Sequence, residues 1–129
     1  MKVEEVVNAV LNLNGGRRFE ETCDQLIVGN WNNEVTGVVS TFMATVEVIR
    51  RTIELGCNLI VTHEPTWFTH TDKTDWLEDD PIYQLKKSLI EDNRISVWRF
   101  HDHMHSGITD LIYDGLLKEL GWESYLEPA

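Results

Sequence analysis

Two strand-like apolar segments separated by a helical pattern constrain the fold of this chain more than any other feature. NEVTGVVST, residues 33–41, and CNLIVTHEP, residues 57–65, are nearly continuous apolar runs, as in strands buried on both faces of a parallel sheet. Residues 42–55 between them are predicted to form a helix, with Thr41 as the N-cap and Gly56 at the end. The buried face of this helix would carry Phe42, Val46, Ile49 and Ile53. A strand, helix and strand in this order predict a right-handed crossover between parallel strands.

The rest of the chain continues this alternation. Residues 3–13 carry a helical apolar stripe, and residues 24–30 and 94–101 are predicted strands, the first of them short. Asp80-Pro81 is a helix start, and residues 108–121 form a last helix that Gly121 ends. The faces expected to be buried carry Ile82, Leu85, Leu89 and Ile90 in the former helix and Ile108, Leu111, Ile112, Leu116 and Leu120 in the latter. We therefore expect residues 1–129 to be a single α/β domain, a three-layer α/β/α sandwich with a mostly parallel sheet.

Composition excludes several classes of partner. The formal net charge of −11 argues against nucleic acid, because a phosphate backbone requires a basic surface. No run of eighteen apolar residues predicts a membrane span, and the N-terminal MKVEEVVNAV lacks the features of a signal peptide. We therefore expect a cytoplasmic protein. Cys23 and Cys57 are isolated and are predicted to be reduced, mostly buried thiols.

All five histidines lie in two short segments. WRFHDHMHS contains His101, His103 and His105, and VTHEPTWFTH contains His63 and His70. Both segments follow predicted strands, at the carboxyl ends where open parallel sheets bind their ligands. If the two strands are neighbours, the two histidine groups meet at one edge of the sheet.

Local geometry separates these side chains further. Pro65 keeps Glu64 extended, so the side chains of Glu64 and His63 are expected to diverge, which suits a site with two metal ions. If the chain stays extended after residue 100, then His101, His103 and His105 share one side. Imidazole and carboxylate donors without thiolate suit Zn²⁺, Mn²⁺, Fe²⁺ or Ni²⁺.

Alternatives to a metal role remain open for several of these residues. His70 lies in a polar loop and is interpreted as a surface residue. Either His101 or His103 could orient a ligand instead of binding metal. Asp102 could simply be solvated.

Beyond these patterns, the sequence resembles a known family. VTGVVSTFMAT, IELGCNLIVTHEPTWF and FHDHMH are similar to segments of the Nif-three-like dinuclear-metal-centre proteins, which are also called type-two GTP cyclohydrolase-like. The similarity runs from about Cys23 to Trp122 and covers the family's N-terminal lobe only.

The resemblance implies a set of ligands. In the family, a His-His or His-Glu pair after the second strand places one residue on each of two divalent metals, which implies His63 and Glu64 here. A later H-x-x-x-D motif supplies an aspartate ligand; His101 matches its histidine, and His105 stands where the aspartate would be. Family members continue for a hundred or more residues to a C-terminal H-x-x-x-E, which residues 1–129 do not contain. The resemblance also implies homo-oligomers, in the form of toroidal hexamers.

Two functions follow as hypotheses. The first is a metal-dependent hydrolase with one or two ions, acting on a small molecule in a cyclohydrolase-like or phosphoester reaction, with Glu64 as the general base. The second is a non-enzymatic metal-binding or regulatory module that assembles into an oligomer.

Overall fold

The protein is described by a computed structural model that covers residues 1–128. Its elements, in chain order, are α1 (Val3–Leu13), β1 (Leu26–Val28), β2 (Val38–Thr41), α2 (Val46–Glu54), β3 (Leu59–Thr62), α3 (Pro81–Asp92), β4 (Ser96–Arg99), α4 (Asp102–His105), α5 (Leu111–Leu120) and the 3-10 helix η1 (Glu123–Tyr125). None of the helices in this part of the chain is long and apolar enough to cross a membrane.

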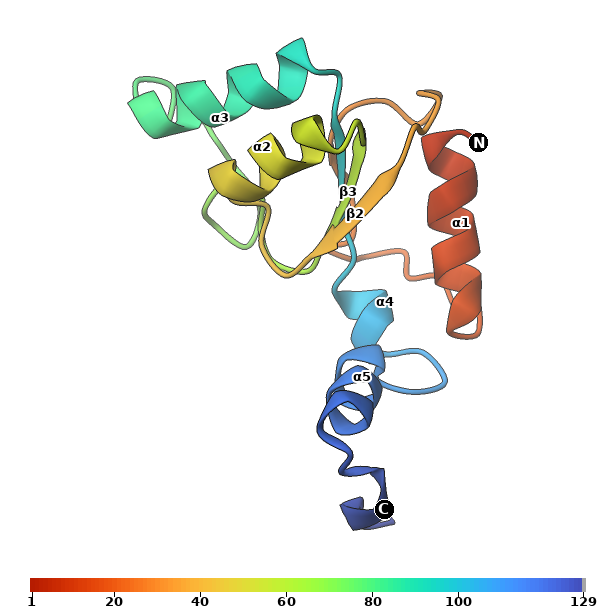
Figure 1. The fold of residues 1–129 in the computed structure, drawn as a ribbon. Coiled ribbons are helices and arrows are strands. Elements are labelled where there is room, and N and C mark those ends of the chain that lie inside the picture. The colour runs from red at the N-terminus through yellow and green to blue at the C-terminus, as the bar shows by residue number, and fades with distance from the viewer. Residues whose placement is uncertain (129) are drawn as a thin grey trace.

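The four strands form one sheet in the order β1-β4-β3-β2. Strands β2, β3 and β4 are parallel to one another, and β1 runs antiparallel on the outer edge of β4. Helix α1 covers one face of the sheet, while α2 and α3 cover the other (Figure 1). The predicted α/β/α sandwich is confirmed, and its sheet is mixed. Because β3 and β4 are neighbours, their carboxyl ends meet at one edge, as expected for the two histidine segments.

The core consists of two apolar clusters, one on each face of the sheet. On β3, Leu59 and Val61 face α1, whereas Ile60 belongs to the cluster beneath α2 and α3. On β4, Trp98 faces α1 and Val97 belongs to the cluster beneath α2 and α3. This alternation is the period of two expected for a strand that is covered on both sides. It fixes the register in which β3 and β4 deliver the residues that follow them.

The segment before α2 differs from its prediction. Strand β2 lies at the edge of the sheet, so its side chains are half-buried or exposed instead of fully buried. The helix begins at Val46, and Thr45 is its N-cap, since the Thr45 side chain accepts a hydrogen bond from the Val48 amide at 3.2 Å. Thr41 is therefore not the cap. Phe42 lies outside the helix with 58% of its surface exposed, instead of on its buried face.

Helix α3 begins as predicted, with Asp80 as its N-cap and Pro81 in its first turn. Its buried face is different, because Tyr83 and Ile90 are buried while Ile82 and Leu85 are exposed. In the structure α3 lies beside α2 on the same face, and its start extends away from the strands, so its apolar residues near the start reach solvent (Figure 1).

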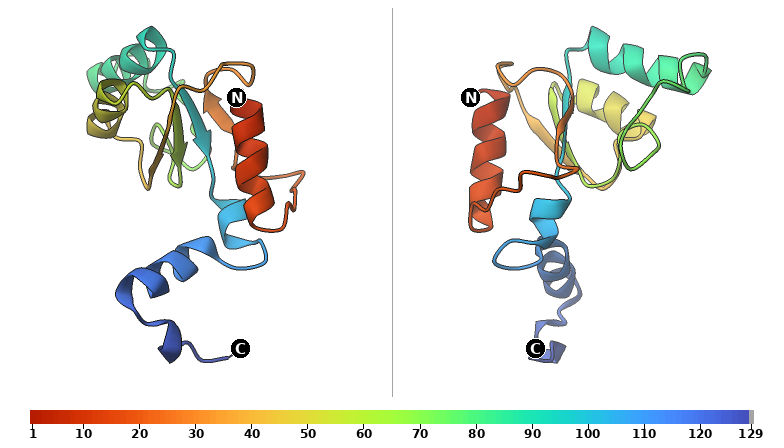
Figure 2. Two further views of the ribbon diagram at one scale, coloured as in Figure 1. Left: turned by 45° about the vertical axis from the view of Figure 1, so that its right-hand side comes forward. Right: turned by 180° about the vertical axis from the view of Figure 1, so that it is seen from behind.

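Helix α5 forms within the predicted range, and Gly121 ends it in a left-handed conformation. However, none of its residues is buried, although five apolar positions of this segment were expected to be. The helix projects away from the sandwich beyond the carboxyl end of β4 (Figure 2). Since α4 turns the chain away from the sheet, α5 lies outside the layers of the sandwich.

Candidate metal centre

His63 is the first residue after β3 and is held in place by both neighbouring strands. Its amide donates to the Thr41 carbonyl at 3.3 Å, and its own carbonyl accepts from Arg99 Nε at 3.4 Å. The Phe42 ring stacks on the imidazole with a centroid distance of 4.9 Å and an interplanar angle of 13°. The side chain is therefore buried and fixed in orientation at the carboxyl edge of the sheet.

The segment after β4 forms the short helix α4 instead of the continued extension that was predicted. The cause is Asp24, a buried carboxylate from the loop before β1. Its Oδ1 accepts from the amides of His101 and Asp102, both at 2.8 Å, and its Oδ2 accepts from the His103 amide at 2.9 Å. Three consecutive amides directed at one carboxylate are the arrangement of a capped helix N-terminus, so the chain turns at this point.

This turn sorts the three histidines onto different sides. His101 and His105 are four residues apart on one side of a helical turn, and His63 faces them. The ring nitrogens of these three residues lie within 4.8 Å of one another, as donors to one ion would. His103 points elsewhere, because its Nδ1 donates to Asp24 at 2.7 Å and its Nε2 accepts from the Phe19 amide at 3.2 Å. The expectation that all three share one side is wrong.

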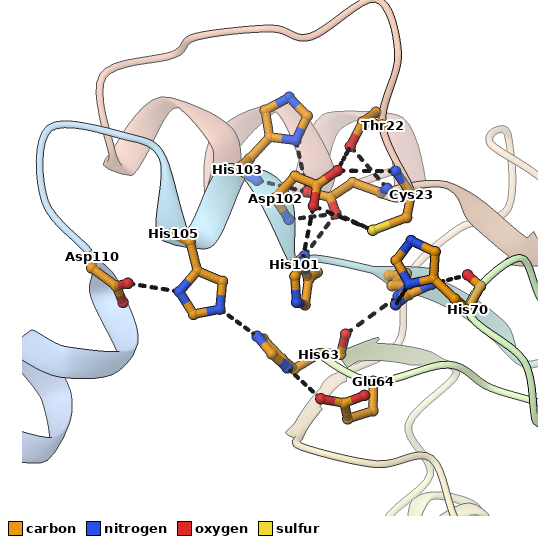
Figure 3. Close-up of polar contacts among 12 residues, drawn as sticks. Thr22, Cys23, His63, Glu64, His70, His101, Asp102, His103, His105 and Asp110 are labelled. Atoms are coloured by element: carbon orange, nitrogen blue, oxygen red, sulfur yellow. Dashed lines mark hydrogen bonds and ion pairs between the residues drawn. The ribbon is translucent and has the colours of Figure 1, made fainter.

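Each of the three converging rings has a carboxylate behind it (Figure 3). The Nδ1 atoms lie close to carboxylate oxygens in the pairs His63–Glu64 at 3.2 Å, His101–Asp102 at 2.9 Å and His105–Asp110 at 2.6 Å. A carboxylate can only accept, so the Nδ1 atom must carry the proton and the Nε2 atom of a neutral ring keeps its lone pair. Carboxylates in this position orient histidine ligands and fix their tautomer at metal sites.

Two of these lone pairs face each other. The Nε2 atoms of His63 and His105 are 2.9 Å apart, and neither can donate in the tautomer set by the carboxylates. Such a pair requires a shared positive charge, which a proton or a metal ion can supply. Burial and the neighbouring His101 lower the pKa of His63, which disfavours the proton on that ring. The donor set therefore fits a divalent metal ion.

A second group of potential ligand atoms, from Cys23, His101 and Asp102, adjoins the first. Burial raises the pKa of Asp102, but hydrogen bonds from Thr22, His101 and Cys23 outweigh it and hold that pKa well below its usual range. Burial and the hydrogen bond to Asp102 raise the pKa of Cys23 to about 11. At neutral pH the thiol is protonated where no ion is bound, and it contacts Asp102 Oδ1 at 3.4 Å as a donor.

Glu64 differs from its expected position. Its side chain was expected to diverge from that of His63, but Oε1 lies 3.2 Å from His63 Nδ1. The carboxylate therefore supports the His63 ring, outside the group of three converging nitrogens. One third of its side chain, 34%, remains exposed beside the site.

Three other residues of this region were not anticipated as part of a site. Asp24 and Arg99 have no local pattern that marks them, since their partners are distant in sequence. Asp110 does carry such a signal, because an aspartate before an apolar helical run is a typical N-cap. It caps α5 through the amides of Ile112 and Tyr113 while its other oxygen holds His105. His70 is an exposed loop residue, as its interpretation required.

Known proteins share this sequence pattern. Residues 1–124 match the family model described as Duf34/NIF3 (NGG1p interacting factor 3). A protein of Clostridium acetobutylicum named GTP cyclohydrolase 1 type 2 homolog is 31% identical over 98 residues, which cover 76% of this chain and 35% of that protein. A protein of the same name in Clostridium perfringens is 29% identical over 88% of this chain and 44% of its own length. The chain thus spans less than half the length of these relatives.

Solved structures agree in fold. The Staphylococcus aureus hypothetical protein SA1388 superposes with a TM-score of 0.69 at 24% identity, over 94% of this chain and 34% of its own. Reduced HcgD from Methanocaldococcus jannaschii gives a TM-score of 0.65 at 17% identity, over 88% of this chain and 46% of its own. At these identities the likeness shows a shared fold.

Replacing Asp24 tests its role at the start of α4. In Asp24→Asn, an amide group must replace one carboxylate oxygen, and in either orientation it faces N–H donors that need an acceptor. We expect the free energy of unfolding to fall by about 2–4 kcal/mol, because buried donors lose charged partners. Urea denaturation measures this. The matched change Glu20→Gln, at an exposed position of the same loop, should stay within about 0.5 kcal/mol of the wild type. Equal stability of the two variants would contradict the assignment.

The raised pKa of Cys23 predicts slow alkylation. With a pKa of about 11, only about one thiol in 1,000 is ionised at pH 8, so the rate should rise about tenfold per pH unit up to pH 10. Iodoacetamide labelling followed by peptide mass spectrometry measures the rate at Cys23 separately from that at Cys57. Asp102→Asn should shift the profile to lower pH, since it removes a negative charge next to the thiol. A plateau below pH 9 in the wild type would overturn the prediction.

Proposed function

The chain belongs to the Duf34/NIF3 family, and from this premise we propose that it binds a divalent metal ion through His63, His101 and His105 and is a metal-dependent hydrolase. The observation that carries the proposal is the pair of Nε2 lone pairs that face each other at 2.9 Å between His63 and His105. Without a cation between them, these two neutral rings repel each other. Three carboxylates behind the rings add negative charge around the same point, which favours a cation further.

The donor set restricts the ion. Three neutral imidazoles are borderline donors that suit Zn²⁺, Mn²⁺, Fe²⁺ or Ni²⁺, and three-histidine sites leave coordination positions free for water or substrate. We propose one ion at the three histidines and assign Glu64 to a second ion where the site is dinuclear. Glu64 supports this assignment because one third of its side chain is exposed next to His63.

The chemistry of hydrolysis places distinct demands on the neighbouring residues. A bound divalent ion lowers the pKa of water towards neutrality and polarises the bond to be cleaved. We assign Glu64 as the general base: its Oε1 holds His63 Nδ1 beside the site, and 34% of its side chain is exposed, so its other oxygen would accept the proton of the attacking water. His101 and His105 are each 31% exposed in their side chains, so a small substrate can reach the site from solvent.

The class of substrate follows from the family. Relatives are named GTP cyclohydrolase 1 type 2 homolog, which supports a cyclohydrolase-like or phosphoester reaction for this chain as well. Because the chain spans about a third to less than a half of those proteins, their activity as whole proteins is carried over here as a proposal only.

We further propose that the chain forms homo-oligomers through α5. This helix buries none of its residues and exposes Tyr113, Leu116 and Leu120, and Trp122 beyond its end is 55% exposed. Apolar surface of this kind is typical of contact sites.

Light scattering after gel filtration should give a mass above one chain, and Leu116→Glu should reduce it to that of a monomer. Lys118→Glu, an exposed change on the same helix, serves as the control. A monomeric wild type at micromolar concentration would exclude the proposal.

Metal content tests the binding site directly. We expect the purified protein to retain a divalent ion after dialysis, while His63→Ala and His105→Ala each lose at least about nine tenths of it, since a site of three ligands loses one. Elemental analysis by mass spectrometry measures the ratio of metal to chain. His70→Ala, at an exposed histidine outside the group, should retain the ion. Unchanged metal content in both ligand variants would overturn the site.

Glu64→Gln distinguishes hydrolysis from binding alone. If Glu64 accepts the proton, the variant should keep the ion at the three histidines but lose about 100-fold or more in turnover, the usual size of a general-base contribution. The assay is a hydrolysis screen over nucleotides and phosphodiesters, with loss of activity on chelation as its control. A metal-loaded wild type that hydrolyses none of these would instead favour the non-enzymatic, regulatory module.

A further inference from the structure

Arg99 is a buried cation that forms no ion pair. It is the last residue of β4, with 2% of its surface exposed. Among residues 1–128, no carboxylate lies within the 4.0 Å that defines an ion pair with its guanidinium. The chain has 22 acidic residues, so the lack of a partner does not reflect a shortage of carboxylates. A buried charge without a counterion is expensive and is usually kept for a ligand or a function.

The hydrogen bonds of Arg99 leave donors unused. Nη1 donates to the His70 carbonyl at 2.6 Å, Nη2 lies 3.4 Å from His70 Nδ1, and Nε donates to the His63 carbonyl at 3.4 Å. A guanidinium carries five N–H groups, so these three contacts leave two of them without a partner in the described chain. None of the three partners is a carboxylate, so no ion pair within the described residues holds the guanidinium.

The guanidinium lines a cavity of about 270 Å³. The volume is several times the roughly 30 Å³ that a water molecule occupies in the liquid. Other residues on its wall are Thr22, Cys23, Gln25, Ile27, His70 and Thr71. Asp72 also lines the cavity, but its two oxygens accept from the amides of Thr66 and Trp67 at 3.1 and 2.7 Å. The cavity thus combines an unpaired cation with hydroxyl, amide and imidazole groups, which suit an oxyanion.

The cavity adjoins the candidate metal centre. Cys23, on its wall, has its sulfur within 4.8 Å of a ring nitrogen of His101. On the other side, Arg99 Nε holds the carbonyl of His63, a second proposed ligand. Cys23 and Arg99 thus form the wall between the cavity and the three histidines, which do not line it themselves.

We propose that this cavity binds the phosphoryl group of the substrate, with Arg99 as the residue that recognises it. Arginine suits this role because its planar fork donates two parallel hydrogen bonds to phosphate oxygens and keeps its charge when buried. The assignment to a substrate rests on the proposed hydrolase function, whereas binding of the anion itself does not. It narrows the substrate to a phosphate ester whose phosphoryl group sits beside the metal ligands.

The test uses the full chain after chelation, so that no metal can bind the anion. Inorganic phosphate and phenyl phosphate are titrated at constant ionic strength in chloride, and binding is followed by calorimetry and by the thermal shift. We expect saturable binding of both in the wild type. Arg99→Met should weaken it at least about tenfold, and Arg99→Lys, which keeps the charge but loses the fork, should fall in between. Arg51→Met, at an exposed arginine of α2 paired with Glu54, is the matched control and should bind as the wild type does.

The outcomes separate this proposal from the metal site. If neither phosphate compound binds the wild type, or if Arg99→Met binds as well as the wild type, the subsite is overturned. Binding of inorganic phosphate alone would overturn the assignment to a substrate ester. Should Arg99→Met fail to fold by circular dichroism, Thr71→Val, an exposed change on the cavity wall, takes its place and should weaken binding about two- to fivefold. His63→Ala should lose metal but keep phosphate binding, so failure of the metal site remains distinguishable from failure of the subsite.

Discussion

The contact of the Asp24 carboxylate with the segment after β4 is the interaction on which the rest of the site depends. One buried side chain accepts three consecutive amides, from His101 to His103, and also the imidazole of His103. Charge-assisted bonds of this kind are the strong ones, and here they stop the strand and start a helical turn. Without that turn, His105 would lie on the extended chain, away from His63.

The three rings are held in place by carboxylates of the chain itself. Two of the three supporting carboxylates, Glu64 and Asp102, directly follow the histidine that they hold, so a local contact fixes each ring. The third, Asp110, is the N-cap of α5 and links His105 to the projecting helix. A change in the direction of α5 therefore moves the carboxylate that orients one ring. The orientations of the His63 and His101 rings are therefore fixed locally, whereas the orientation of the His105 ring depends on the position of α5.

Local patterns predicted the elements that depend on local physics. Periodicity and capping predicted the helices at residues 3–13 and after Asp80, and the length of the crossover predicted the parallel pairing of β2 with β3. All three are confirmed. The convergence of His63, His101 and His105 followed from strand ends and family resemblance. The turn at α4 could not be predicted, since its cause lies nearly eighty residues earlier in the chain. The prediction that α5 is buried is also wrong. An apolar stripe indicates that a helix has a contact surface, but it does not say which partner covers that surface.

Negative and positive side chains lie in different places around the site. Carboxylates surround the three imidazoles and favour a cation at their centre, while the surface as a whole, with a net charge of −11, repels anions. The anionic substrate that we propose would therefore need a local positive charge, and Arg99 is buried next to the three histidines with no ion pair among residues 1–128. Because burial shields that charge from solvent, it acts more strongly on a group that enters the cavity than an exposed arginine would. The same sheet edge thus offers a place for a cation and, beside it, a place for an oxyanion, which is the pairing that metal-dependent cleavage of a phosphate ester requires.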